Sequence, residues 1–266
     1  MHLSIISRIK EDSRFSKKRC LTLIDDLESF KVLLDLGFGG LVKAIFVTPK
    51  FEKLQIIKHF KNVQVVSKQI LAKILEIDNP SLCAIIDISD LINRINQLTY
   101  GDDLSKLRVC LVLDSIQNPW NLGGMFRNNS AFGVLDVILV GNCVFPYNPR
   151  VIRASKGYVF EQKIRMTNYQ NLAEFIKTLI NQGINYRAYF LQNRLECRDI
   201  STLDFHGLVN CTNFFILGNE EKGISRELYE IFKNYQEIRI DVRIDSLNVF
   251  ATHSIICFLI NQRLRI

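Results

Sequence analysis

The pattern of apolar and polar positions divides the chain into two stretches of alternating helix and strand. In the first stretch, residues 19–36 place apolar side chains at helical spacing and predict one helix, which ends at Gly37. Short β-rich runs follow, separated by helical segments near 51–60 and 67–76. This alternation predicts a small α/β domain over residues 1–92. Its predicted strands are 42–47, 63–66 and 82–88.

The second, longer stretch begins after a polar segment. Residues 93–106 include the turn signal Tyr-Gly-Asp-Asp, so we expect a linker there. From residue 107 the alternation restarts with near-continuous apolar runs, which are typical of parallel strands buried on both faces. An α/β fold with a parallel sheet is therefore predicted over residues 107–266. The predicted strands are 108–114, 134–141, 186–191, 213–218 and 237–242, and the predicted helices are 122–132, 172–181, 225–234 and 249–264.

The last predicted helix differs from the others because it has no polar stripe. Apolar side chains surround residues 249–264 on nearly every side. Such a helix must be buried, either in the core or against a second subunit. Because a large exposed apolar patch marks an interface, we predict a homodimer.

The amino-acid composition bears on the location of the protein in the cell and on whether it binds a metal ion. With 48% apolar residues in 266, the chain can bury a sizeable core, and no apolar run approaches the ~20 residues that span a bilayer. The start of the chain has no signal-peptide layout, so a cytoplasmic location is expected. The seven cysteines stand singly and the four histidines are scattered, so we expect reduced, buried thiols and no metal site.

The net charge of +7 is unevenly distributed along the chain. Basic patches attract phosphate backbones, but a solvated basic face explains such clusters equally well, so charge alone leaves nucleic-acid binding open. One cluster comprises Arg8, Lys10, Arg14, Lys17, Lys18 and Arg19, and a second comprises Arg150, Arg153, Lys156, Lys163 and Arg165.

Three predicted strands of the second stretch end in unusual loops. The loops cover residues 114–134, 214–225 and 238–249. Each combines Gly or Asn with a polar side chain just before a helix. Ligands of open parallel sheets bind beyond the carboxyl ends of the strands, so these loops form the candidate site. Each loop alone also has a structural explanation, since Asn121 and Ser246 would cap helices and Glu220 would begin a solvated one.

Taken together, the loops supply the groups that a nucleotide substrate needs. Asn121 is expected in the loop before its helix, with Arg127 on the first helical turns. The set offers amides and small residues for a nucleoside, a cation for phosphate and acceptors for a ribose. The chain has no Ser-His-Asp set, no Walker lysine and no Gly-x-Gly-x-x-Gly motif after a strand, which disfavours hydrolases, NTPases and ordinary dinucleotide enzymes.

The segments NPWNLGGMFRNNSAFG, LGNEEKGIS and DSLNV resemble, in this order, the three signature motifs of the SpoU (TrmH-like) branch of the SPOUT RNA methyltransferases. The resemblance implies an α/β methyltransferase domain with a deep C-terminal trefoil knot, a homodimer, and S-adenosylmethionine as the methyl donor. In the third motif, Phe250 stands where the family usually has a small serine. Ile240 is a rival to Ile238 as the isoleucine that contacts the donor. By this resemblance the donor pocket falls on Leu217, Gly218, Asn219, Ile238 and Leu247.

The first stretch more loosely resembles the substrate-binding domain that many of these enzymes carry, which is similar to the ribosomal protein L30e fold. This resemblance implies that residues 1–92 bind the RNA substrate and that residues 107–266 form the SPOUT methyltransferase domain. We expect ribosomal RNA rather than tRNA, because an extra RNA-binding domain suits a structured stem-loop target.

The implied reaction is an in-line attack of a ribose 2′-oxygen on the methyl carbon of a sulfonium. We interpret Arg127 as an electrostatic anchor for the target phosphate and ribose, because a guanidinium with a pKa above about 12 is a poor base. Asn121 would orient Arg127 or the ribose, and Glu220 would hold Arg127 or the incoming nucleotide. Ser246 and Asn248 would shape the site, and the identity of the general base stays open.

Two alternatives remain open from the sequence. A non-catalytic RNA-binding or ribosome-assembly protein would keep the fold, and an enzyme that methylates a base would keep the donor pocket. The presence of Asn121, Arg127, Glu220 and Asn248 favours an enzyme over the first alternative. The first motif, which contains Asn121 and Arg127, favours a ribose over a base as the group that is methylated.

Overall fold

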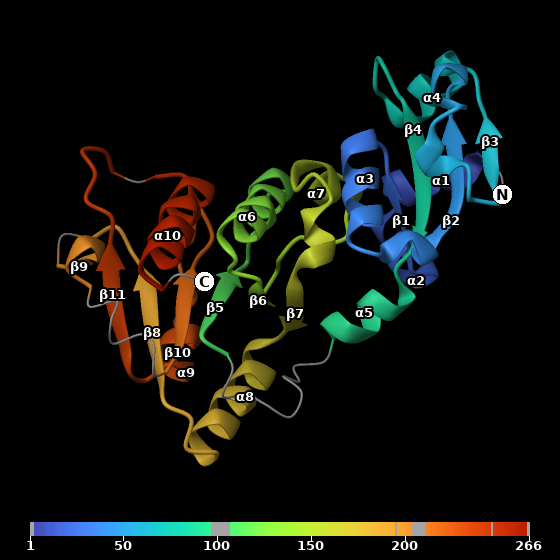
Figure 1. The fold of residues 1–266 in the computed structure, drawn as a ribbon. Helices are drawn as coiled ribbons and strands as arrows, with labels where there is room; N and C mark the ends of the chain where they lie inside the picture. The colour runs from blue at the N-terminus through green and yellow to red at the C-terminus, as the bar shows by residue number, and fades with distance from the viewer. Residues whose placement is uncertain (1–2, 97–106, 195, 204–210, 246, 265–266) are drawn as a thin grey trace. The chain divides into compact units, whose positions relative to one another are not determined.

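The computed structural model gives positions for five stretches of the chain, and their contacts form two compact units (Figure 1). The described residues are 3–96, 107–194, 196–203, 211–245 and 247–264. The first unit comprises Met1–Asn93 and Phe145–Glu161, and the second comprises Arg94–Val144 and Gln162–Ile266. Residues 97–106, most of the predicted linker, lie outside the described residues.

The first unit is built on a mixed four-stranded sheet. Its strands are β1 (Leu21–Ile24), β2 (Val42–Val47), β3 (Val63–Val65) and β4 (Leu82–Asp87), in the order β1-β4-β2-β3. β4 is antiparallel to both neighbours, whereas β2 and β3 are parallel. The helices of residues 1–95 are α1 (Ser4–Glu11), α2 (Ser13–Arg19), α3 (Leu27–Asp35), α4 (Lys68–Leu75) and α5 (Ser89–Ile95). Apolar side chains of α1, α4 and the sheet share one buried cluster.

The helix predicted over residues 19–36 is wrong in its first part. Residues 21–24 form β1, and α3 begins only at Leu27. All four β1 positions are buried, and such a short run without polar alternation does not distinguish a strand from a helix. Asp26 sets the start of α3, because its carboxylate accepts the backbone N–H of Ser29 at 2.8 Å.

The other predictions for this unit have different outcomes. Gly37 follows the end of α3 with a φ of +83°, which confirms the predicted glycine cap. The segment 51–60, predicted as a helix, contains only short 3-10 turns, at Pro49–Phe51 and Gln55–Ile57. The three predicted strands are confirmed.

The segment 145–161 groups with the first unit although it follows β6 of the second unit in sequence. It carries α7 (Pro149–Ala154) and a 3-10 turn at Tyr158–Glu161. Arg153 forms an ion pair with Asp25 at 2.7 Å, and Lys156 forms one with Glu28 at 2.6 Å. Burial raises the pKa of Asp25, and the Arg153 guanidinium opposes that rise. Much of the second predicted basic cluster is therefore neutralised by acidic partners.

The second unit is built on a parallel seven-stranded sheet in the order β7-β6-β5-β10-β8-β11-β9. The strands are β5 (Val109–Asp114), β6 (Asp136–Val140), β7 (Lys163–Thr167), β8 (Tyr186–Leu191), β9 (Arg198–Asp199), β10 (Thr212–Leu217) and β11 (Tyr235–Arg239). All five predicted strands are present. The two that the sequence did not predict, β7 and β9, are the edge strands, and edge strands carry polar side chains that hide the apolar pattern.

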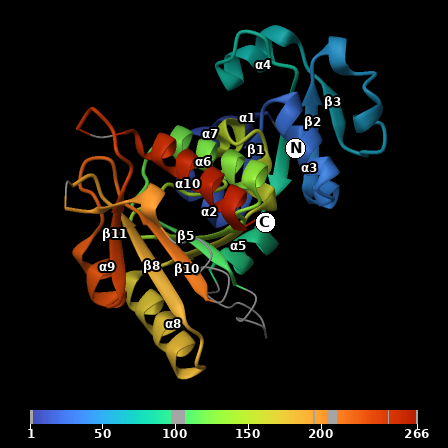
Figure 2. The ribbon, with the colours of Figure 1, turned by 60° about the vertical axis from the view of Figure 1, so that its left-hand side comes forward.

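Helices cover both faces of this sheet. They are α6 (Pro119–Phe132), α8 (Tyr169–Asn181), α9 (Arg226–Ile231) and α10 (Val249–Leu264), with a 3-10 turn at Ile200–Thr202. Apolar side chains of α8 and α9 pack with one face of β5, β6, β8 and β10 in a single buried cluster. α6 and α10 lie side by side, away from α8 (Figure 2). No helix among the described residues is long and apolar enough to span a bilayer.

The contact between α6 and α10 is very close at one point and polar at another. A Cβ added to Gly124 would lie 2.7 Å from the ring of Phe250, so the glycine lets the two helices approach. One turn further along, Asn129 donates to Gln162 at 3.1 Å and accepts from Nε2 of His253 at 2.9 Å. Both Asn129 and His253 are fully buried. The prediction of a buried last helix is confirmed on this side.

His253 should make the stability of the protein depend on pH. Burial lowers the pKa of His253 to about 3, whereas an unfolded histidine titrates near about 6.5. Between these values the unfolded chain binds a proton that the folded chain rejects, so the free energy of unfolding falls as the pH drops below about 6.5. We expect a loss on the order of 2 kcal/mol between pH 7 and pH 5, measured by urea unfolding. His253→Gln should reduce this slope, and an unchanged slope would contradict the assignment.

Candidate functional site

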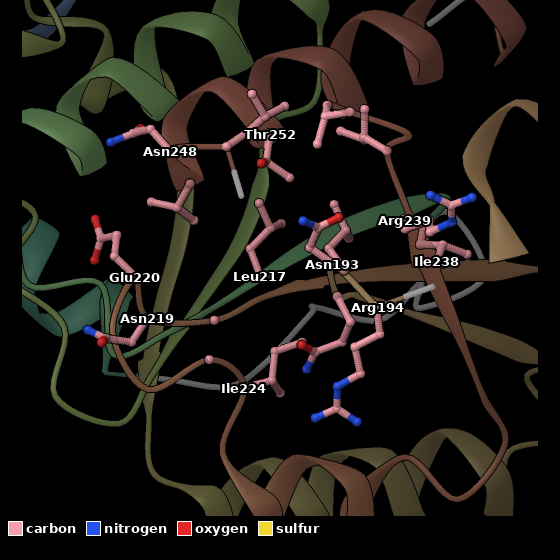
Figure 3. A pocket seen from close by; sticks show the side chains of 18 of the residues that line it. Asn193, Arg194, Leu217, Asn219, Glu220, Ile224, Ile238, Arg239, Asn248 and Thr252 are labelled. Carbon is pink, nitrogen blue, oxygen red and sulfur yellow. The ribbon is translucent and has the colours of Figure 1, made fainter. Parts of the chain in front are cut away.

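A cavity of about 410 Å³ lies at the carboxyl ends of three strands in the second unit. Residues at or just after the ends of β8, β10 and β11 line it, together with the first turn of α10. Figure 3 shows Glu220 and Asn248 on one side of this cavity and Arg194 and Arg239 on the other. This edge is where parallel sheets bind ligands, and the size suits a small molecule.

Most of the predicted site residues border this cavity. Glu220 and Asn248 line it, and so does Ile240, which means that both candidate isoleucines are present. Ser246 lies outside the described residues. Neither Asn121 nor Arg127 is a lining residue. The five residues predicted for the donor pocket all line the cavity: Leu217, Gly218, Asn219, Ile238 and Leu247.

The loop after β10 is closed by its own backbone. Asn219 and Gly223 exchange two backbone hydrogen bonds of 3.0 and 2.9 Å. Gly218 has no room for a side chain, because a Cβ there would lie 2.3 Å from the carbonyl carbon of Gly223. The side-chain oxygen of Asn219 accepts the N–H groups of Glu221 and Lys222 at 2.9 and 3.1 Å. The wall at residues 218 and 219 is therefore formed largely by backbone.

A buried carboxylate ties this loop to the loop after β5. Asp114 is fully buried and accepts the Tyr169 hydroxyl at 2.8 Å and the Ser225 N–H at 2.7 Å. Ser115 donates to the same carboxylate at 3.0 Å, and its carbonyl accepts the side chain of Asn219 at 2.9 Å. Burial raises the pKa of Tyr169, which keeps its hydroxyl proton available to this network.

Asp114 and Tyr169 are functional candidates that no sequence motif had indicated. A signal for Asp114 was present, because a carboxylate that ends a strand buried along its whole length needs buried partners. No local pattern identifies Tyr169, which lies 55 residues away along the chain and meets Asp114 only in the folded sheet.

Asn121 lies inside α6 rather than in the loop before it, so this part of the prediction is wrong. Asn118 is the capping residue, and its side chain accepts the N–H groups of Trp120 and Asn121 at 2.9 and 3.4 Å. Pro119 occupies the first helical position, where its missing N–H has no cost. The side chain of Asn121 donates instead to the carboxylate of Glu220, which joins the first and second motifs.

Arg127 lies in the third turn of α6, and its side chain is exposed. Within the described part of the chain it has neither a hydrogen bond nor an ion pair. Its two predicted partners, Asn121 and Glu220, are bonded to each other. The structure therefore does not bring Arg127 to the cavity, and its predicted role stays a prediction.

Two arginines that the sequence analysis did not identify line the cavity. Arg239 ends β11 and donates from Nη1 to Asp241 at 2.6 Å, while its Nε is buried without a partner among the described atoms. A buried N–H without an acceptor is costly, so it favours an anionic group on a ligand. Arg194 follows β8 at the same edge.

The composition of the cavity fits a donor of the predicted kind. Leu217, Ile224 and Ile238 are buried apolar residues that suit a purine ring. The unpartnered Nε of Arg239 suits the carboxylate of an amino acid, and Glu220 offers negative charge for a sulfonium. Among residues with described positions, no group of three or more His, Cys, Asp and Glu side chains could hold a metal ion.

Comparison with known proteins points in one direction. The model of the SpoU rRNA Methylase family matches residues 108–258. An uncharacterized tRNA/rRNA methyltransferase of Mycoplasma pneumoniae is 29% identical over 182 residues, which cover 68% of this chain and 72% of that protein. The 23S rRNA (guanosine-2′-O-)-methyltransferase RlmB of Xanthomonas axonopodis is 30% identical over 155 residues, 58% of this chain and 59% of that protein.

A solved structure extends the likeness of the fold to nearly the whole chain. The SpoU methyltransferase AviRb of Streptomyces viridochromogenes, in complex with the cofactor AdoMet, has a TM-score of 0.76. The match covers 99% of this chain and 98% of that one at 16% sequence identity. At this identity the match bears on the fold alone.

Gly218→Ala should prevent the cavity from binding a small ligand. A methyl group at this position overlaps the backbone of Gly223, so the loop must open and the wall at residues 218 and 219 must move. We expect S-adenosylmethionine to bind the unaltered protein in calorimetry and to bind the variant at least about tenfold more weakly, the equivalent of ~1.4 kcal/mol. Gly40→Ala is the matched control, because a Cβ there meets open space. Equal affinity in all three proteins would contradict this site.

Proposed function

This chain belongs to the SpoU rRNA methylase family, and we infer from that membership and from its named relatives that it is an S-adenosylmethionine-dependent RNA 2′-O-methyltransferase. The family model matches more than half of the chain and includes all three signature motifs. The assignment to a site rests on one observation, which is that described residues of the second and third motifs line the same cavity.

We propose that this cavity holds the methyl donor. Leu217, Ile238 and Leu247 would enclose the purine, and the backbone around Gly218 and Asn219 would contact polar groups of the nucleoside. Arg239 would bind the carboxylate through its unpartnered Nε. When bound, S-adenosylmethionine supplies a methyl group on a positively charged sulfur.

The Asn121–Glu220 pair would receive the ribose that is methylated. The amide of Asn121 occupies one carboxylate oxygen of Glu220, which leaves the second oxygen as an acceptor for a ribose hydroxyl. Because Glu220 also lines the cavity, a hydroxyl held there lies beside the donor site. In the reaction the 2′-oxygen forms a bond to the methyl carbon, the carbon–sulfur bond breaks, and the hydroxyl proton is released. Asn248 would shape the same end of the site, and the role of Ser246 stays a prediction.

Arg127 would hold the phosphate of the target nucleotide and stabilise the developing negative charge on the 2′-oxygen. Its exposure and its lack of partners in the described part of the chain leave all of its N–H groups available to RNA. A guanidinium suits this task because its planar fork matches a phosphate. The general base is not assigned.

Arg127→Ala should remove methyl transfer and leave donor affinity nearly intact, because no residue of the proposed donor pocket is changed. Loss of one transition-state donor typically costs on the order of a hundred- to a thousandfold in rate. Arg127→Lys should restore little, since an ammonium lacks the two-pronged contact. Single-turnover transfer of labelled methyl to unmodified ribosomal RNA measures the effect.

A melting curve of each Arg127 variant is the control for folding. A surface arginine with no function would change stability by less than about 0.5 kcal/mol and leave transfer unchanged. A folded Arg127→Ala protein with normal transfer would therefore remove Arg127 from the site. Label found on a base instead of a 2′-oxygen would overturn the ribose assignment.

We propose ribosomal RNA as the substrate and a division of labour between residues 1–92 and 107–266. An L30e-like first domain would bind RNA through the exposed basic residues of α1 and α2, which are Arg8, Arg14, Lys17, Lys18 and Arg19. The C-terminal domain would carry the trefoil knot of the family, formed by the chain from β10 to α10. Similarity of fold to AviRb over nearly the whole chain supports the architecture on which these domain assignments rest.

We further propose that the protein is a homodimer that joins through α6 and α10. Phe258 on α10 is 48% exposed and lies edge-on to Phe132 of α6, with 6.1 Å between ring centroids. An exposed phenylalanine, packed against an aromatic ring of a neighbouring helix, suits a symmetric helix interface.

Phe258→Ser should shift the protein toward the monomer, because it removes an apolar contact that both copies would contribute. Light scattering at micromolar concentration should give a dimer for the unaltered protein and a lower mass for the variant. Ile180→Ser is the matched control, since Ile180 is 56% exposed on α8, away from the proposed interface. A monomer before substitution would contradict the dimer.

A further inference from the structure

The single tryptophan of the chain is exposed beside the proposed catalytic residues. Trp120 exposes 55% of its surface, which is unusual for so large an apolar side chain. Its backbone is fixed, because Pro119 precedes it in the first turn of α6 and Asn118 accepts its N–H at 2.9 Å. The indole is thus presented to solvent from a rigid position.

Two neighbours define what this indole could meet. Asn121 follows directly, and its side chain is bonded to Glu220 at the cavity. Arg127 lies seven residues after Trp120 in α6. This spacing places both residues on the same helix face, about 20° apart around the axis and roughly 10 Å apart along it. An aromatic surface and a partner-free guanidinium therefore share one exposed face next to the Asn121–Glu220 pair.

We propose that Trp120 stacks on an unpaired base of the RNA substrate, adjacent to the nucleotide whose phosphate Arg127 holds. This inference rests on the proposed function. Aromatic side chains stack on any base, and a guanidinium binds the backbone between bases, so the two side chains together suit a single-stranded segment. Trp120 would thereby hold the RNA strand beside the Asn121–Glu220 pair.

An RNA base suits this face better than a second copy of the chain. In a two-fold dimer with its axis at this patch, Arg127 of each copy would approach the other, and Arg127 has no ion pair in the described part of the chain. RNA instead brings negative charge to Arg127 and to a chain of net charge +7.

Because Trp120 is the only tryptophan, its fluorescence reports on this one position. Transcribed, unmodified 23S ribosomal RNA should quench the emission of the protein, with Trp120→Phe as the blank and free tryptophan amide as the correction for absorption. RNA that is retained with the protein on a filter but leaves the corrected emission unchanged would overturn the proposal. An emission shift that follows dilution of the protein alone would show that a second copy covers Trp120, and would also overturn it.

Kinetics with the same RNA separate a stacking role from a structural one. Trp120→Ala should raise the KM for RNA about 5- to 150-fold, the equivalent of the ~1–3 kcal/mol of one stacked base. Single-turnover rate at saturating RNA and donor affinity should change little, and Trp120→Phe should recover most of the loss. Ile180→Ala, at a site of equal exposure on α8, should leave KM unchanged.

These measurements distinguish failure of the stacking proposal from failure of the proposed function. If the unaltered protein binds no donor and transfers no methyl, the function itself is wrong. If it transfers methyl and Trp120→Ala has the same KM, only the stacking proposal is wrong. A Trp120→Ala protein that loses donor affinity would show a structural role at the start of α6.

Discussion

The candidate site depends on the buried carboxylate of Asp114. A carboxylate without contact to water is stable only when its oxygens are hydrogen-bonded, and here the donors are the adjacent Ser115 and two residues from other segments of the second unit, Tyr169 and Ser225. Tyr169 brings the start of α8, Ser225 brings the end of the second motif, and Ser115 holds Asn219. The loops after β5 and β10 therefore have one common fixed point at the end of a central strand.

How much the sequence predicts depends on whether the signal is local. The five central strands and the last helix are long apolar patterns, and the structure has them where the sequence places them. The donor-pocket residues were assigned through resemblance and converge on one cavity. The Asn121–Glu220 bond, the partners of Asp114 and the unpartnered Nε of Arg239 arise only when distant segments meet, so no local pattern contains them.

The cavity and the exposed face of α6 differ in how complete they are within one chain. Backbone bridges and Asp114 fix the cavity wall, so the donor would meet a prepared surface. The side chains of Arg127 and Trp120 have no hydrogen-bonding partner in the described part of the chain, and they would contact RNA. Donor recognition would then use a surface completed within the chain, whereas substrate recognition would use side chains whose partners belong to the RNA. The bond between Asn121 and Glu220 joins the two.

Because Gly124 lies so close to Phe250, the residue that is tolerated at position 124 depends on the residue at position 250. A side chain at 124 fits only if the ring at 250 becomes smaller, and the serine that is usual in the family at the second position would leave that space open. Each change alone either causes a clash or leaves a void, so their effects on stability should not be additive. Substitutions at these two sites would then be accepted in a preferred order, and related chains should vary at them together.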